Sequence, residues 1–310
     1  MAKMEPTPTG TVEKLTDAEL SKILGRYQAM ESVSILIGAL LVAAGCISAF
    51  VVHSRELLAI LALSGVALML VVGLPAQKKK KALLQQQMGG FFRAKLEQAF
   101  GPEPQTPELP IDRAVLSDSG LIIQSWNNCT VTDFHEGHHK SLRFSAANVT
   151  LSHTFEEKTA PNSDDWMTRS ETIFRGIVVR CGALCDPAAD LAVSDWLHKL
   201  AEGDQAEPAV FRERFSARTG DGQPADEQVT PELRCFMAGF EKTLGGRLCG
   251  LVIRNGELLL ALQTGYVFAA IPDVLDLRDI NGIRKWYDAS LAGMSRLLDI
   301  LLESPVIHRA

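Results

Sequence analysis

The chain has 310 residues, of which 46% are hydrophobic, and its formal net charge is -6. A protein that binds nucleic acid usually carries an excess of basic residues, so this balance argues against nucleic acid as a partner. Six cysteines in a chain of this length do not form a disulfide scaffold. The composition instead indicates a protein with enough apolar residues to bury a sizeable core.

The first 31 residues are polar, and we expect them to form a cytosolic N-terminal segment. Met1–Gly10 is rich in Pro and Thr, which predicts disorder. Thr16 and Glu19 have the spacing of a capping box, in which each residue satisfies a backbone N–H of the other. A helix is therefore predicted to begin at Asp17 and to run through Tyr27 toward the next segment.

Two uncharged apolar runs follow, Val33–Val52 and Leu57–Leu74, joined by the short polar loop His53–Glu56. About 20 helical residues with a rise of 1.5 Å each cover a hydrocarbon layer of roughly 30 Å. Residues 32–75 are therefore predicted to form a two-span transmembrane hairpin. The alternative is a buried helical hairpin of a soluble protein, which would normally show a polar face.

Small residues at four-residue spacing are expected to let the two helices of this hairpin approach closely. The pairs are Ala39 with Ala43 and Gly45 with Ala49. We interpret them as packing positions within the hairpin.

Four lysines, Lys78, Lys79, Lys80 and Lys81, follow shortly after the second run. Lysine and arginine close to a span stay on the cytoplasmic side, and the connecting loop holds only Arg55. The predicted location is thus the inner (cytoplasmic) membrane, with two spans and both termini cytoplasmic. The same lysines lie at the membrane surface, where binding to anionic lipid is a second interpretation.

Residues 76–110 are predicted to contain a basic helix and a stalk. Ala82–Phe100 has a helical pattern, with an interruption expected at Gly89 and Gly90. Gly101–Pro110 is rich in Pro, which favours an extended conformation. This segment either separates the anchor from the following domain or packs along the side of that domain.

Residues 111–310 are predicted to form a cytosolic α+β domain with a mostly antiparallel sheet and packed helices. Strands are expected at Gly120–Gln124, Cys129–Phe134, Leu142–His153, Glu171–Cys181 and Val210–Arg218, and a short helix at Asp190–Ala201.

The strongest local signals lie in the last third of the chain. Thr230 before Pro231 predicts a helix start, and Gly245 predicts its end. Asn255-Gly256 between two apolar runs predicts a hairpin of two central strands. A long amphipathic helix is predicted from Leu277 until Pro305 ends it.

Three stretches together resemble a known family: Ile173–Val179, Phe211–Ser216 and the helix that begins Thr230-Pro231-Glu232-Leu233. With a two-span anchor in front, the region from Ala94 to Leu302 resembles the bacterial membrane-anchored family of domain of unknown function 3137. The resemblance brings no catalytic residues, and it implies a LemA-type membrane protein as a partner. The segment Gly222–Glu227 departs from the family's usual pattern, which puts any role of that segment in doubt.

His135, Glu136 and His139 match the H-E-x-x-H pattern of zinc hydrolases. That chemistry needs a helix, which places both imidazoles on one face with the Glu beside them. Here the pattern lies between strand-like segments, and Gly137 favours a hairpin turn. We therefore predict no metal site, with these three residues as weak candidates and His153 as a candidate third ligand.

The remaining chemical groups favour ordinary structural roles. Cys181 and Cys185 are predicted to pack in the core, and Asp164-Asp165 to lie in a solvated loop. Neither a phosphate-binding glycine loop nor a nucleophile elbow is present in the sequence, and we expect no cofactor.

Two hypotheses on function follow. The first is a membrane-anchored cytosolic interaction or regulatory module that binds a protein or lipid partner next to the bilayer. The alternative is a membrane-tethered metal-dependent hydrolase that uses His135, Glu136 and His139.

Overall fold

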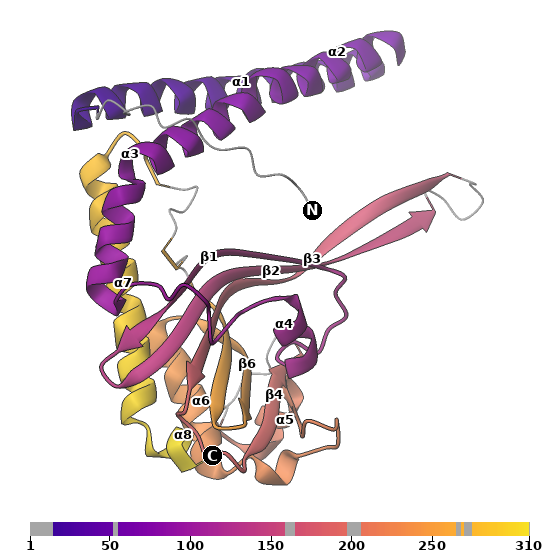
Figure 1. The fold of residues 1–310 in the computed structure, drawn as a ribbon. Helices are drawn as coiled ribbons and strands as arrows, with labels where there is room; N and C mark the ends of the chain where they lie inside the picture. The colour runs from indigo at the N-terminus through magenta and orange to yellow at the C-terminus, as the bar shows by residue number, and fades with distance from the viewer. Residues whose placement is uncertain are drawn as a thin grey trace. The chain divides into compact units, whose positions relative to one another are not determined.

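The computed structural model describes residues 15–51, 55–158, 165–196, 206–264, 268–269 and 275–309 (Figure 1). The chain divides into two units, residues 1–93 with 274–285 and residues 94–273 with 286–310. Some predictions concern residues outside the described ranges. They are those for Met1–Gly10, for the start of the loop at residue 53, for Asp164 and for residues 197–201.

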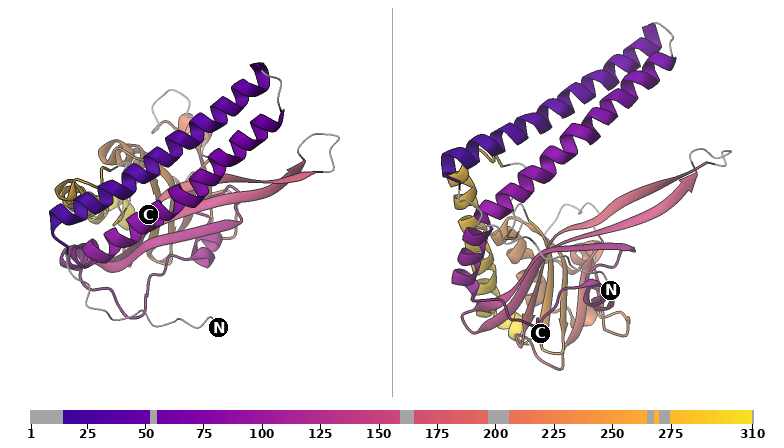
Figure 2. Two further views of the ribbon diagram at one scale, coloured as in Figure 1. Left: turned by 90° about the horizontal axis from the view of Figure 1, so that it is seen from above. Right: turned by 45° about the horizontal axis from the view of Figure 1, so that its top comes forward.

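The first unit is a pair of long helices that lie side by side (Figures 1 and 2). Its elements are α1 (Asp17–Val51), α2 (Arg55–Leu68), the π-helical turn η1 (Met69–Gly73), the first part of α3 (Leu74–Phe100) and the start of α7 (Ile280–Glu303). The predicted capping box is confirmed, because Thr16 N–H donates to Oε2 of Glu19 at 2.9 Å and Glu19 N–H donates to Oγ1 of Thr16 at 3.3 Å. Two segments, Asp17–Ser48 and Ala59–Phe100, are long and apolar enough to cross a membrane.

The two helices approach each other closely at glycines. A Cβ atom added to Gly65 would lie 2.6 Å from the carbonyl oxygen of Gly38, and one added to Gly73 would lie 2.9 Å from Oγ of Ser34. Ala39 and Ala43 are exposed, so the prediction that they pack in the hairpin is wrong. Spacing alone establishes that small residues share a face, but it does not establish which face meets the partner helix.

Helix α3 is continuous, so the predicted interruption at Gly89 and Gly90 is wrong. Leu84, Met88 and Phe92 are buried at four-residue spacing along it. Burial of this stripe outweighs the cost of about 1 kcal/mol for each glycine in a helix interior.

The second unit is built on a seven-stranded antiparallel sheet with helices packed on it, which confirms the predicted α+β class. The strand order is β1-β2-β3-β7-β6-β4-β5. The strands are β1 (Asn128–His139), β2 (Leu142–Lys158), β3 (Trp166–Gly182), β4 (Asp190–Asp195), β5 (Phe215–Arg218), β6 (Arg247–Arg254) and β7 (Glu257–Gln263). The helices are the end of α3, α4 (Arg113–Ser119), α5 (Pro208–Arg214), the 3-10 turn η2 (Asp226–Gln228), α6 (Pro231–Leu244), the rest of α7 from Trp286 and α8 (Pro305–Arg309).

The strongest sequence signals are confirmed. The β6–β7 turn has positive φ at Asn255 (54°) and Gly256 (78°), and both strands lie in the middle of the sheet. Oγ1 of Thr230 accepts from the N–H of Leu233 at 3.2 Å at the start of α6, and Gly245 ends the helix with φ of 63°.

Three predicted elements are wrong. Residues 190–195 form strand β4 rather than a helix, because they pair with β5 on one side and β6 on the other. Residues 210–218 begin in α5 and become strand only at Phe215. Residues 120–124 form no strand, since Gly120 ends α4 in the left-handed region at φ of 71°. Tertiary pairing overrides local propensity at the first of these positions.

The proline-rich segment packs along the domain, which was one of the two predicted alternatives. Oγ of Ser145 on β2 donates to the carbonyl oxygen of Leu109 at 2.6 Å, and Nη1 of Arg180 on β3 donates to that of Pro110 at 2.8 Å. These bonds fix residues 109–110 to the sheet.

Strands β2 and β3 continue together beyond the rest of the sheet (Figure 2). Their pairing runs from His153 opposite Glu171 to Lys158 opposite Trp166. The neighbouring strands do not extend this far. Strand β1 pairs with β2 only as far as Ser152, and β7 pairs with β3 only from Ile177 onward. We call residues 153–158 and 166–171 the β2–β3 arm.

Candidate functional site

The H-E-x-x-H residues lie within strand β1, and the turn comes later, at Lys140, which has φ of 56°. The prediction of a turn at Gly137 is therefore wrong. Side chains alternate along a strand, so His135 and His139 share one face and Glu136 points to the other. The ring of Phe100 contacts both histidines, with ring centroids at 6.4 Å from His135 and 6.3 Å from His139.

Glu136 is a buried carboxylate that holds the proline-rich segment. Its Oε2 accepts from the N–H groups of Glu108 at 2.9 Å and Leu109 at 3.0 Å, and its Oε1 accepts from Nε of Arg143 at 3.0 Å. With its oxygens committed on the far face of the strand, Glu136 is not placed to activate water between the histidines. In the part of the chain that the structure describes, no three His, Cys, Asp or Glu side chains gather into a metal site.

The two histidines have different surroundings. His135 is buried, and its Nε2 has no hydrogen-bond partner among the described residues. Burial lowers the pKa of His135, while the carboxylates of Glu97 and Glu136 act in the opposite direction. His139 Nε2 lies 2.6 Å from Oδ1 of Asp299 on α7, and Nζ of Lys140 lies 2.7 Å from the same oxygen. The candidate third ligand His153 instead lies with Nδ1 3.1 Å from the carbonyl oxygen of Ser125.

Cys181 and Cys185 are placed for packing, as predicted, whereas Cys235 on α6 is exposed. Cys181 and Cys185 are both buried. Burial raises the pKa of each thiol, to about 12 for Cys185, so neither is a thiolate near neutral pH.

The lysine cluster divides into exposed and paired members. Lys78 and Lys79 are exposed on α3. Nζ of Lys80 instead lies 2.5 Å from Oε2 of Glu31 on α1, and only 9% of the Lys80 side chain is exposed. Lys80, which was predicted to lie at the membrane surface, therefore forms an ion pair between α3 and α1.

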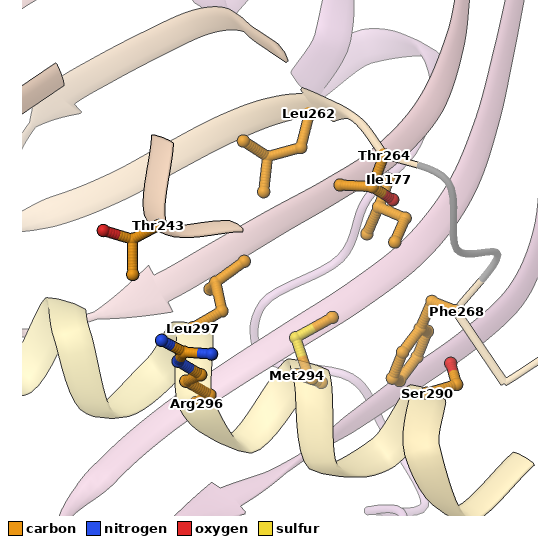
Figure 3. A pocket seen from close by; sticks show the side chains of 10 residues that line it. Ile177, Thr243, Leu262, Thr264, Phe268, Ser290, Met294, Arg296 and Leu297 are labelled. Carbon is orange, nitrogen blue, oxygen red and sulfur yellow. The ribbon is translucent and has the colours of Figure 1, made fainter. Parts of the chain in front are cut away.

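A pocket of about 100 Å³ lies between the sheet, the end of α6 and the middle of α7 (Figure 3). Apolar side chains form most of its lining: Ile177, Leu262, Phe268, Met294 and Leu297. Thr243, Thr264, Ser290, Gly293 and Arg296 complete it. A mostly apolar lining with a few polar groups is typical of small-molecule sites.

The β2–β3 arm is the second candidate site. It exposes Phe155 (37%), Trp166 (60%) and Met167 (41%), although large apolar side chains are usually covered. Nζ of Lys158 lies 5.5 Å from the centre of the Trp166 ring. The predicted strands reached only His153 and Glu171, the first residue pair of the arm. The pocket was not predicted, because its walls are brought together from β3, β7, α6 and α7.

Comparisons with models of known protein families, with curated proteins and with solved structures found no match for this chain.

Proposed function

We propose that the protein is a two-span inner-membrane protein whose cytosolic domain binds a partner through the β2–β3 arm. Two features support the membrane part. Both hairpin helices turn large apolar side chains outward, among them Leu36 (60%), Leu40 (61%), Leu63 (70%) and Val71 (72%). Transfer of such surface from water to hydrocarbon is favourable, and the exposed lysines beyond the second run favour cytoplasmic termini.

The arm is the observation that carries the binding part of the proposal. A two-stranded hairpin without a third strand or a covering helix is only marginally stable in water. The side chain of Asn127 occupies the edge of β2 at Thr154. Beyond this residue the strand edges offer backbone pairing to a partner, and the exposed Trp166 and Met167 offer an aromatic anchor. The resemblance to the family of domain of unknown function 3137 favours a LemA-type membrane protein as this partner, and it stays a prediction.

The alternative, a metal-dependent hydrolase, has no comparable support. Glu136, the residue that would activate water, is buried on the opposite face of β1 from His135 and His139. We therefore favour the interaction module.

Photo-crosslinking in native membranes tests the binding part. A benzophenone amino acid replaces Trp166 on the arm or, as the control, the exposed Glu232 on α6. We expect a discrete crosslinked product from position 166 alone, and its loss when Met167→Glu is added. Identical products from both positions would contradict the proposal.

Sedimentation tests the membrane part independently. The full-length protein is expected in the pellet after an alkaline carbonate wash of lysed cells, and in solution only after detergent is added. A reporter fused after Ala310 is expected to behave as cytosolic. Recovery of the protein in the supernatant without detergent would contradict the anchor.

A further inference from the structure

We propose that the pocket of Figure 3 binds a small carboxylic acid, with its apolar chain between β3, β7 and α7 and its carboxylate on Arg296. This site does not depend on the arm or on membrane insertion.

The size of the pocket limits the apolar part of the ligand. The volume is about 100 Å³. An apolar cavity of about 150 Å³ accepts benzene, so this one fits a smaller group, a chain of about three carbons. Leu262, Met294 and Leu297, which line the pocket, are almost fully buried. Transfer of the apolar chain of the ligand from water to contact with these side chains would therefore be favourable.

Gly293 keeps the α7 side of the pocket open. A Cβ atom at this position would meet no heavy atom within 4 Å, although the residue lies in the interior of a long helix and lines the pocket. Glycine is the least favourable residue there apart from proline. Packing against neighbouring atoms therefore does not require a glycine here, and a side chain at this position would enter the open space beside the pocket.

Arg296 supplies the charge that selects an acid. It is the only charged side chain among the described residues that line the pocket, and no other described residue forms a hydrogen bond or ion pair with it. In Figure 3 it lies toward the Thr243 end, with Phe268 and Ser290 at the other end. The Thr243 hydroxyl donates to the carbonyl oxygen of Gly239 at 2.9 Å, which leaves the guanidinium as the donor for a carboxylate at this end.

Ligand-detected NMR with the full-length protein in nanodiscs tests the proposal, with empty nanodiscs as the blank. The probe is butyrate, and its neutral analogue butyramide is the matched control ligand. A ligand of this size is expected to bind in the millimolar to micromolar range. No saturable signal from butyrate at about 10 mM would overturn the proposal.

Two substitutions test the apolar part of the pocket and the charge of Arg296 separately. Gly293→Leu fills the pocket and is expected to weaken both ligands at least about tenfold, whereas Gly239→Leu, on an exposed and open position of α6, is expected to leave both unchanged. Arg296→Gln is expected to weaken the binding of butyrate about tenfold and to leave the binding of butyramide unchanged.

Unfolding curves followed by tryptophan fluorescence verify that each variant folds. If Gly293→Leu does not fold, the smaller substitution Gly293→Ala is used to fill part of the pocket. Binding by Gly293→Leu or Gly293→Ala that equals the wild type, or equal losses of acid and amide in Arg296→Gln, would overturn the assignment.

Discussion

Arg214 and Asp195 form a buried ion pair, with Nε of the arginine 2.8 Å from Oδ2 of the aspartate and 2% and 0% of the two side chains exposed. Glu241 on α6 also accepts from the Arg214 guanidinium, and Arg247 on β6 donates to Asp195 at 2.8 Å from both Nε and Nη2. The network joins β4, α5, α6 and β6, and Phe211–Ser216, one of the stretches that carry the family resemblance, contains its central arginine.

Asp195→Asn is predicted to lower the free energy of unfolding by about 3–5 kcal/mol, because it leaves the buried Arg214 without its charged partner on β4. The control is Glu157→Gln on the arm, whose partner Arg169 is exposed, and its expected loss is below about 1 kcal/mol. Denaturant unfolding in detergent, followed by tryptophan fluorescence, measures both, since Trp126, Trp166, Trp196 and Trp286 all lie in the second unit. Equal losses in the two variants would contradict a structural role for the network.

Gly250 on β6 is predicted to tolerate no side chain. A Cβ atom there would lie 2.2 Å from the carbonyl oxygen of Leu121, so Gly250→Ala forces the backbone apart and is expected to cost about 2 kcal/mol or more. Gly239→Ala, at an open and exposed helix position, is expected to stabilise the protein by about 0.5–1 kcal/mol. The same unfolding measurement distinguishes them, and a neutral Gly250→Ala would show that the contact can relax.

Gly65 is predicted to set the spacing of the hairpin helices. Cysteines at Ser34 and Gly73 are expected to crosslink under mild oxidation in membranes, because Oγ of Ser34 lies 2.9 Å from the Cβ position of Gly73. Adding Gly65→Leu places a side chain against the Gly38 carbonyl and is expected to reduce the yield severalfold. A cysteine at the outward-facing Leu36 paired with one at Gly73 is the control that should not crosslink. An unchanged yield in Gly65→Leu would contradict this packing.

His135 is predicted to make the domain less stable as the pH falls. Burial lowers the pKa of His135 in the folded state, so the unfolded chain binds the proton more readily. The free energy of unfolding therefore decreases as the pH falls through the unfolded pKa of about 6.5, and this contribution levels off below the folded pKa. Carboxylates whose pKa values are lowered by hydrogen bonds, such as Asp276 at about 2, change the free energy of unfolding only at lower pH.

His135→Phe removes this titration and also the buried Nε2, which has no hydrogen-bond partner in the described part of the chain. Unfolding curves at pH values between about 7.5 and 5.5 should then depend less on pH than those of the wild type. The difference in slope is the diagnostic quantity, because the substitution also changes packing around Phe100. The same slope in both proteins would mean that other groups cause the pH dependence.

Local sequence determined the elements whose signals are local. The capping box at Thr16, the Thr230-Pro231 helix start and the Asn255-Gly256 turn each satisfy backbone groups within a few residues, and the structure has all three where they were predicted. The length and apolar character of the two N-terminal helices were equally readable, because they depend on composition alone.

Tertiary structure decided the rest, because those features depend on which distant segments meet. Strand β4 replaces a predicted helix since β5 and β6 supply its hydrogen bonds, and Glu136 serves the proline-rich segment because the strand turns it away from His135. The pocket that Gly293 and Arg296 line is formed by residues of β3, α6, β7 and α7, which are far apart in the chain. Periodicity places such residues on a face, but only the packing of elements far apart in the chain determines what that face meets.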